Sequence, residues 1–205
     1  MTQLSDFQTD ALCECINIGV GQAAAVLSEL AGEQIDLVIP SIKTVQLHSV
    51  REHLDNHYDK WHSCVLLEFS SKFSGDAVLI FSGKAANGWA ELISSHQFDD
   101  EIELTDDMKN DFLLEIGNIL INGCIGSISN MMEIECDFSI PHIFNRITSE
   151  LFDDMLDRDH SDDFGMIITT TLKAQGKSVT TDLFLTLKNN SMPFFIETID
   201  QLLKG

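Results

Sequence analysis

The chain has 205 residues, a length that fits one large domain or two small domains packed together, and 44% of the residues are hydrophobic. Thirty-three acidic residues against 12 basic ones give a formal net charge of −21, which would repel phosphate backbones and anionic lipid surfaces. We therefore expect a soluble globular protein that binds neither nucleic acid nor membrane surfaces.

The N-terminus and the cysteines indicate the cellular compartment. The opening MTQLSDFQTD lacks the basic start and the apolar region of a secretory signal, and no uninterrupted apolar run reaches the ~18 residues of a membrane span. These features predict a cytoplasmic protein. The cysteines form an odd set without a CxxC pair, which favours reduced, buried thiols over a zinc site. They are Cys13, Cys15, Cys64, Cys124 and Cys136.

The first predicted element is a long amphipathic helix. Ser5 and Gln8 fit the Ser-x-x-Gln capping box of a helix start, and Gly32 fits a helix end. Apolar residues recur between them every three or four positions, which predicts one stripe packed on a core. The stripe comprises Leu12, Ile16, Val20, Ala23, Leu27 and Leu30.

Strands and a shorter helix follow in the first half. Segments rich in β-branched and aromatic residues, bounded by turn signals, favour strands, and an Ala-, Trp- and Leu-rich segment favours a helix. The expected strands cover residues 34–40, 61–69 and 73–81, and the expected helix covers residues 84–95.

The second half has the same order of elements. Thr105 is a suitable N-cap, and Asp106 and Asp107 would lie in the favourable first turn of a second long helix that reaches about Met132. The elements expected after it are strands over 133–141, 166–172 and 179–187 and a helix over 193–203.

Four residues of the first half recur in the second half at a constant distance of 101 residues. The pairs are Asp10 and Asp111, Glu14 and Glu115, Asn17 and Asn118, and Pro40 and Pro141. Such internal symmetry predicts one duplicated domain over residues 1–205 with a pseudo-two-fold axis, in which the repeats cover about 1–100 and 101–205.

Two polar segments, 50–58 and 153–163, are expected to be loops. The second segment is rich in Asp, but an EF-hand loop that began at Asp157 would have Asp162 where glycine is required. His53 and His57 are spaced for one helical face, yet a histidine pair in a polar loop is typical of solvated side chains rather than metal ligands. We predict no metal site in either segment.

The recurring residues form a polar stripe on each long helix. Asp10, Glu14 and Asn17 occupy positions i, i+4 and i+7, so they lie within a narrow arc away from the apolar stripe. Like charges at i and i+4 cost roughly 0.2–0.5 kcal/mol, and Asn is an indifferent helix former, so stability alone does not select this pattern. One such stripe could be an ordinary solvated face. Its repetition, followed each time by proline after the same interval, indicates a functional site.

The spacing Asp/Ser-x3-Glu-x2-Asn-x22-Pro resembles the active-site signature of the CheC/CheX/FliY family of chemotaxis phosphatases. The segment ECINIGVGQAAAVLSELAG is similar to the first helix of that family, and the SGDAVLIF strand extends the resemblance over nearly the whole chain. The resemblance implies an α+β duplicated fold, with an antiparallel sheet behind two long, exposed active-site helices. CheC-like members hold both halves in one chain, as here, which implies a monomer.

The resemblance also implies an enzyme that hydrolyses the aspartyl-phosphate of a CheY-like response regulator. Asn17 and Asn118 would enter the receiver's active site and orient the attacking water, and Glu14 and Glu115 would reach the receiver's lysine. No cofactor belongs to this chain in that scheme, because the receiver supplies the Mg²⁺. The supporting members of the motif are Asp10 and Asp111, which would support the helix or the docking edge, and Pro40 and Pro141, which would close strands.

One position distinguishes the two copies. One turn after the asparagine, Gly21 would allow close approach of a partner, whereas the second copy has Asn122, so the second site is expected to be more crowded or differently tuned. The Asp-rich segment 153–163 is an insertion relative to the first half, and its role stays open.

Other functions stay open at this stage. The main alternative is a non-catalytic module that binds the CheD deamidase or sequesters a phosphorylated receiver, since catalysis and sequestration would use the same surface. A switch component like FliY is disfavoured, because it would need a further C-terminal domain. A metal-dependent hydrolase is disfavoured because no cluster of His, Asp and Cys has ligand spacing.

Overall fold

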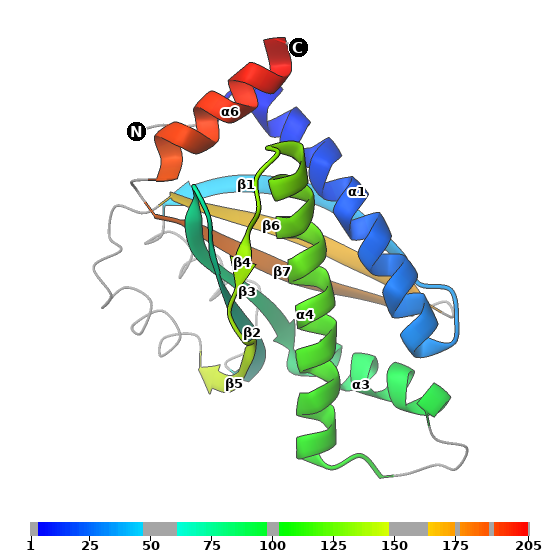
Figure 1. Cartoon of the computed structure of the whole chain (residues 1–205). Helices are drawn as coiled ribbons and strands as arrows, with labels where there is room; N and C mark the ends of the chain where they lie inside the picture. Colours follow the sequence, from blue (N-terminus) through cyan, green and yellow to red (C-terminus); the bar gives the residue numbers. More distant parts are fainter. Residues whose placement is uncertain are drawn as a thin grey trace.

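A computed structural model describes residues 4–46, 61–97, 103–147, 164–174, 177–188 and 191–204. Within these ranges, seven strands form one antiparallel sheet, and the long helices cover one of its faces (Figure 1). The predicted α+β class, with an antiparallel sheet behind two long helices, is confirmed. Segments 50–58 and 153–163, with the histidine pair and the rejected calcium loop, lie outside the described residues.

The strand order shows an internal symmetry. In chain order the elements are α1 (Asp6–Ala31), β1 (Asp36–Gln46), β2 (Trp61–Ser70), β3 (Ser74–Ser82), α3 (Gly83–Gln97), α4 (Asp106–Met131), β4 (Asp137–Phe138), β5 (His142–Ile147), β6 (Phe164–Ala174), β7 (Lys177–Leu187) and α6 (Met192–Lys204). The sheet order is β1-β6-β7-β3-β2-β4, and β5 also pairs with β2. If β1, β2 and β3 exchange places with β5, β6 and β7, the order reverses, which is compatible with the predicted pseudo-two-fold axis. The duplication and its division near residue 100 stay predictions.

The ends of the long helices lie where capping chemistry predicts them. The Ser5 backbone N–H donates to Gln8 Oε1 at 2.8 Å, and the Gln8 N–H donates to Ser5 Oγ at 3.3 Å, which completes the capping box of α1. Gly32 ends this helix in the left-handed conformation with φ of 63°. Thr105 Oγ1 accepts a hydrogen bond from the Met108 N–H at 3.3 Å and caps α4.

Two predictions about strands are wrong. The expected strand over 133–141 is reduced to the two residues of β4, and the longer ladder with β2 begins only at β5, after Pro141. Residues 137–140 are all exposed, so the alternating pattern there has no buried face to fill. Pro40 lies inside β1 rather than at its end, beside a register shift between Val38 and Ser41. Because β1 is at one end of the described sheet, an irregularity there accommodates a residue without an N–H.

The main core lies between the helices and the sheet. The apolar stripe of α1 lies in it as predicted: Leu12, Ile16, Val20, Ala23 and Leu27 are buried, and Leu30 packs against their cluster. A smaller cluster occupies the alternate residues of the central strands, and therefore the opposite face of the sheet. It comprises Cys64, Val78, Ile80, Ile167 and Phe184.

Helices α1 and α4 lie side by side and antiparallel (Figure 1). Cys15 Sγ and Ser127 Oγ are 3.3 Å apart, and the backbones of Gly19 and Gly123 meet one turn along each helix. Residue numbers therefore rise on α1 as they fall on α4. Each polar stripe lies in the N-terminal half of its helix, so the two stripes lie toward opposite ends of the pair.

Both long helices are also long and apolar enough, by length and composition alone, to cross a membrane. Roughly half of the most apolar stretch of each helix is buried inside the protein, as in the core helices of soluble proteins. No membrane is indicated.

Candidate functional site

The first polar stripe lies on the outer face of α1. Asp10, Glu14 and Asn17 are all exposed, whereas the neighbouring Leu12 and Ile16 are completely buried. The period of 3.6 residues per turn produces this division, because residues 12 and 16 point to the sheet when 10, 14 and 17 point away. Neither Glu14 nor Asn17 makes a side-chain hydrogen bond with a residue that the structure describes. Both side chains can therefore turn toward a docking partner.

The second stripe has the same backbone geometry but a different hydrogen bond. Asp111 and Glu115 are exposed on α4, whereas Asn118 is half-buried. Asn122 Nδ2 donates a hydrogen bond of 2.7 Å to Asn118 Oδ1. The asparagine of the second site is therefore already engaged within its own helix.

Gly21 leaves the corresponding position on α1 open. A Cβ atom built on Gly21 would meet no atom within 4 Å apart from its chain neighbours and the backbone of its own helix. The second site is therefore more crowded than the first, as predicted, because the amide of Asn122 occupies a position that is free space at Gly21.

The motif prolines lie in or directly beside a strand and not on the helices. Pro40 is inside β1, and Pro141 directly precedes β5, where it is half-buried. The helical members of each motif are thus brought together on one face, and each proline belongs to the sheet behind its helix.

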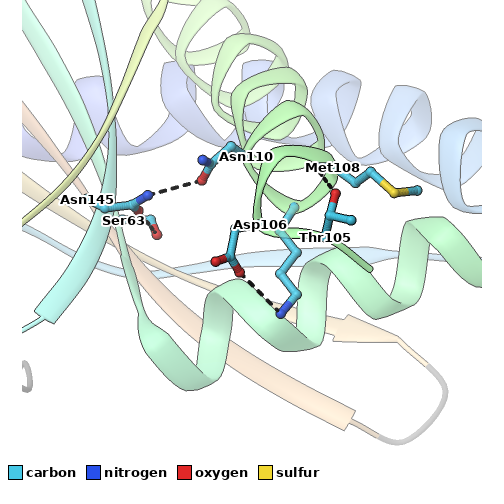
Figure 2. A network of polar contacts seen from close by, with 7 residues as sticks. Ser63, Thr105, Asp106, Met108, Asn110 and Asn145 are labelled. Atoms are coloured by element: carbon cyan, nitrogen blue, oxygen red, sulfur yellow. Dashed lines mark hydrogen bonds and ion pairs between the residues drawn. The ribbon is translucent and has the colours of Figure 1, made fainter. Parts of the chain in front are cut away.

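A polar cluster that the sequence did not reveal ties α4 to the sheet beside the second stripe (Figure 2). Ser63 Oγ on β2 donates to Asn145 Oδ1 at 2.7 Å, and Asn145 Nδ2 on β5 donates to Asn110 Oδ1 at 3.2 Å. Lys109 Nζ lies 3.9 Å from Asp106 Oδ1 in the first turn of α4. These residues line a pocket of about 310 Å³. The partners are 35 and 82 residues apart along the chain, so no local pattern could have indicated them.

Exposed apolar side chains flank the first stripe. Phe7 is 77% exposed and Ile18 is 62% exposed, and their spacing of 11 residues, three helical turns, places them on the same side of α1. Their counterparts on α4, Met108 and Ile119, are half-buried. A partner that docks on α1 would therefore cover more apolar surface around the motif than one that docks on α4.

The electrostatic field of the first stripe is negative. Burial raises the pKa of the Cys13 thiol, and the adjacent Asp10 and Glu14 carboxylates raise that pKa further, so the thiol stays protonated at neutral pH. Among the described residues, no group of three His, Cys, Asp or Glu side chains could hold a metal ion. Each stripe thus offers two carboxylates and one amide, a set that suits contact with a partner that carries positive charge.

Comparisons with known proteins show a sequence relative and a shared fold. The CheY-P phosphatase CheC of Bacillus subtilis is 25% identical over 152 residues, which cover 72% of this chain and 72% of CheC. FliY of Thermotoga maritima superposes with a TM-score of 0.75 at 19% identity, over 98% of this chain and 100% of the FliY chain. No family model matches the chain.

Two solved complexes contain chains of the same fold. A chain of the FliG–FliM complex of Helicobacter pylori superposes with a TM-score of 0.66 at 10% identity, over 93% of this chain and 100% of that chain. A chain of the CheX–CheY–BeF3–Mg²⁺ complex of Borrelia burgdorferi superposes with a TM-score of 0.51 at 14% identity, over 86% of this chain and 99% of that chain. The fold is thus shared by FliY and by chains of the FliG–FliM and CheX–CheY complexes, and the name of the sequence relative is that of a CheY-P phosphatase.

Proposed function

We propose that this chain is a phosphatase of a CheY-like response regulator and a member of the CheC/CheX/FliY family of chemotaxis proteins. The sequence match to CheC and the fold shared with FliY and CheX support this proposal. The substrate would be the aspartyl-phosphate of the receiver domain. The observation that carries the proposal is the exposed pair on α1, in which Glu14 and Asn17 lie one turn apart without a described hydrogen-bond partner.

The reaction is the hydrolysis of an acyl phosphate. The oxygen of water attacks the phosphorus, the bond between phosphorus and the aspartate oxygen breaks, and a carboxylate and dihydrogen phosphate leave. Both hydrogens of the water end on the phosphate, so atoms and charge balance. Such phosphoryl transfer depends on positioning and electrostatics, and the receiver would supply the Mg²⁺ that steadies the phosphoryl oxygens.

The amide of Asn17 suits the placement of that water. Its oxygen can accept a hydrogen bond from the water, its NH2 group can donate one, and the side chain carries no charge that would repel the phosphoryl group. Asn118 would have the same role on α4. Both lie on rigid helices, which favours a fixed approach geometry.

The glutamates would bind the receiver. Glu14 and Glu115 are exposed one turn before the asparagines, where each could form a charge-assisted hydrogen bond with a lysine. This contact would exist in the ground-state complex and would set the register of docking.

A cytoplasmic location follows from the proposed substrate.

A non-catalytic role is the second candidate, and the shared fold with the FliG–FliM complex favours it. In that case the same helix face would hold a phosphorylated receiver, or a protein such as CheD, without turnover. The two functions differ in one measurable quantity, the rate of phosphate release.

The deciding experiment measures phosphate release from the phosphorylated CheY-like receivers of the same organism. We expect wild-type protein to accelerate release, Asn17→Ala and Asn118→Ala each to retain part of this activity, and the double variant to fall to the receiver's own rate. Asn130→Ala is the matched control, since Asn130 is an exposed asparagine of α4 outside the stripe. If wild-type protein binds a receiver but releases phosphate no faster than the double variant, the non-catalytic role replaces the phosphatase.

A further inference from the structure

We infer that Asn122 is a positioning residue that restrains Asn118, so that the site on α4 turns over more slowly than the site on α1. The inference rests on the proposed function and assigns unequal activities to its two sites. Three observations carry it: the hydrogen bond on α4, the free space at Gly21 on α1, and the different exposure of the two asparagines.

The hydrogen bond is built into the helix geometry. Residues 118 and 122 are one turn apart on the same face, and helical side chains lean toward the N-terminus, so Asn122 leans over Asn118. The distance of 2.7 Å from Asn122 Nδ2 to Asn118 Oδ1 is short for an amide pair. Asn118 is also half-buried, whereas Asn17 is exposed.

This contact opposes the position that catalysis needs. To reach a phosphoryl group in a docked receiver, the amide of Asn118 must extend away from α4. The hydrogen bond from Asn122 must then break, and Asn122 Nδ2 must donate to water instead. A hydrogen bond of ordinary net strength corresponds to a rate difference of about 2- to 12-fold.

The asparagine of the site on α1 is not restrained by such a hydrogen bond. Apart from its chain neighbours and the backbone of its own helix, no atom lies within 4 Å of the position that a Cβ of residue 21 would occupy, so Asn17 can extend freely. The exposed side chains of Phe7 and Ile18 add apolar surface beside it, whereas their counterparts on α4 are half-buried. Docking and extension of the asparagine both favour α1.

The test isolates each site in turn. In an Asn17→Ala background, in which only α4 is active, Asn122→Ala should raise kcat by about 2- to 12-fold with little change in KM, because the restraint acts on the asparagine and not on docking. In an Asn118→Ala background, Gly21→Asn should lower kcat by a similar factor relative to Gly21→Ala. The comparison with Gly21→Ala separates the amide from the added Cβ.

A second readout is independent of turnover. Side-chain couplings measured by NMR should show one dominant χ1 rotamer of Asn118 in the wild-type protein and averaging in Asn122→Ala. An unchanged rotamer population would overturn the restraint, whatever the activity.

The kinetic outcomes separate the inference from the proposed function. If the wild-type protein never accelerates phosphate release, the proposed function is wrong, and the inference that the two sites have unequal activities fails with it. An active wild-type protein in which Asn122→Ala lowers or preserves the kcat of the α4 site overturns only the inference, since the contact would then prepare Asn118 for catalysis.

Discussion

A Cβ atom built on Gly19 would lie 2.0 Å from the carbonyl oxygen of Gly123, so α1 and α4 touch through their backbones. The same atom would lie 2.6 Å from the Cβ of Ser127. No side chain larger than hydrogen fits at residue 19 unless the helices separate. The close crossing determines how the two helices, and therefore both polar stripes, are placed relative to one another.

Gly19→Ala should destabilise the protein by about 1–3 kcal/mol, the usual range for overpacking a tight contact. Urea denaturation monitored by circular dichroism measures the change. The matched control is Gly21→Ala on the same helix, where the added Cβ meets no neighbour. That control should be neutral or more stable by up to about 1 kcal/mol, because alanine favours a helix interior. Equal stabilities of the two variants would contradict the close crossing.

Replacing both Glu14 and Glu115 by Gln should weaken binding of a beryllofluoride-activated receiver. Each charge-assisted hydrogen bond contributes about 1.5–3 kcal/mol, and glutamine retains the shape without the charge. Isothermal titration calorimetry gives the affinity. The Asn17→Ala, Asn118→Ala double variant should keep nearly wild-type affinity, because its contribution arises in the transition state. Glu29→Gln, at an exposed glutamate of α1 outside the stripe, is the control. Wild-type affinity in the double glutamine variant would exclude the ion pair.

Stability should fall above pH 9 through Cys124. Burial, followed by the charge of neighbouring Cys15, raises the pKa of the Cys124 thiol from 9.0 to about 12. Between these values the unfolded chain releases a proton that the folded protein retains, so rising pH favours unfolding by about 1.4 kcal/mol per pH unit. Below pH 9 the thiol is protonated in both states and the effect vanishes.

The measurement compares the free energy of unfolding of wild-type protein and Cys124→Ala between pH 8 and pH 11. The variant lacks the titrating thiol, so its stability should decline less steeply. Identical slopes would show that Cys124 does not titrate differently in the two states.

The local features of this protein are determined by its sequence. Ser5, Gly32 and Thr105 mark the helix ends because capping involves residues within one turn of each other. The polar stripes face outward because helical periodicity alone separates Glu14 and Asn17 from the apolar residues between them. The contrast between Gly21 and Asn122 is also local, because each of these residues lies one turn after the motif asparagine of its own helix.

Only the tertiary structure decided the features that join distant parts of the chain. The segment 133–141 has the alternation of a strand, but whether it pairs depends on where β2 ends, so most of it forms none. The amides of Asn110 and Asn145 meet because α4 crosses β5, and the backbones of Gly19 and Gly123 meet because two helices pack on one sheet. A local sequence pattern reflects interactions among residues that are close along the chain. The contacts named here depend instead on how the whole core packs.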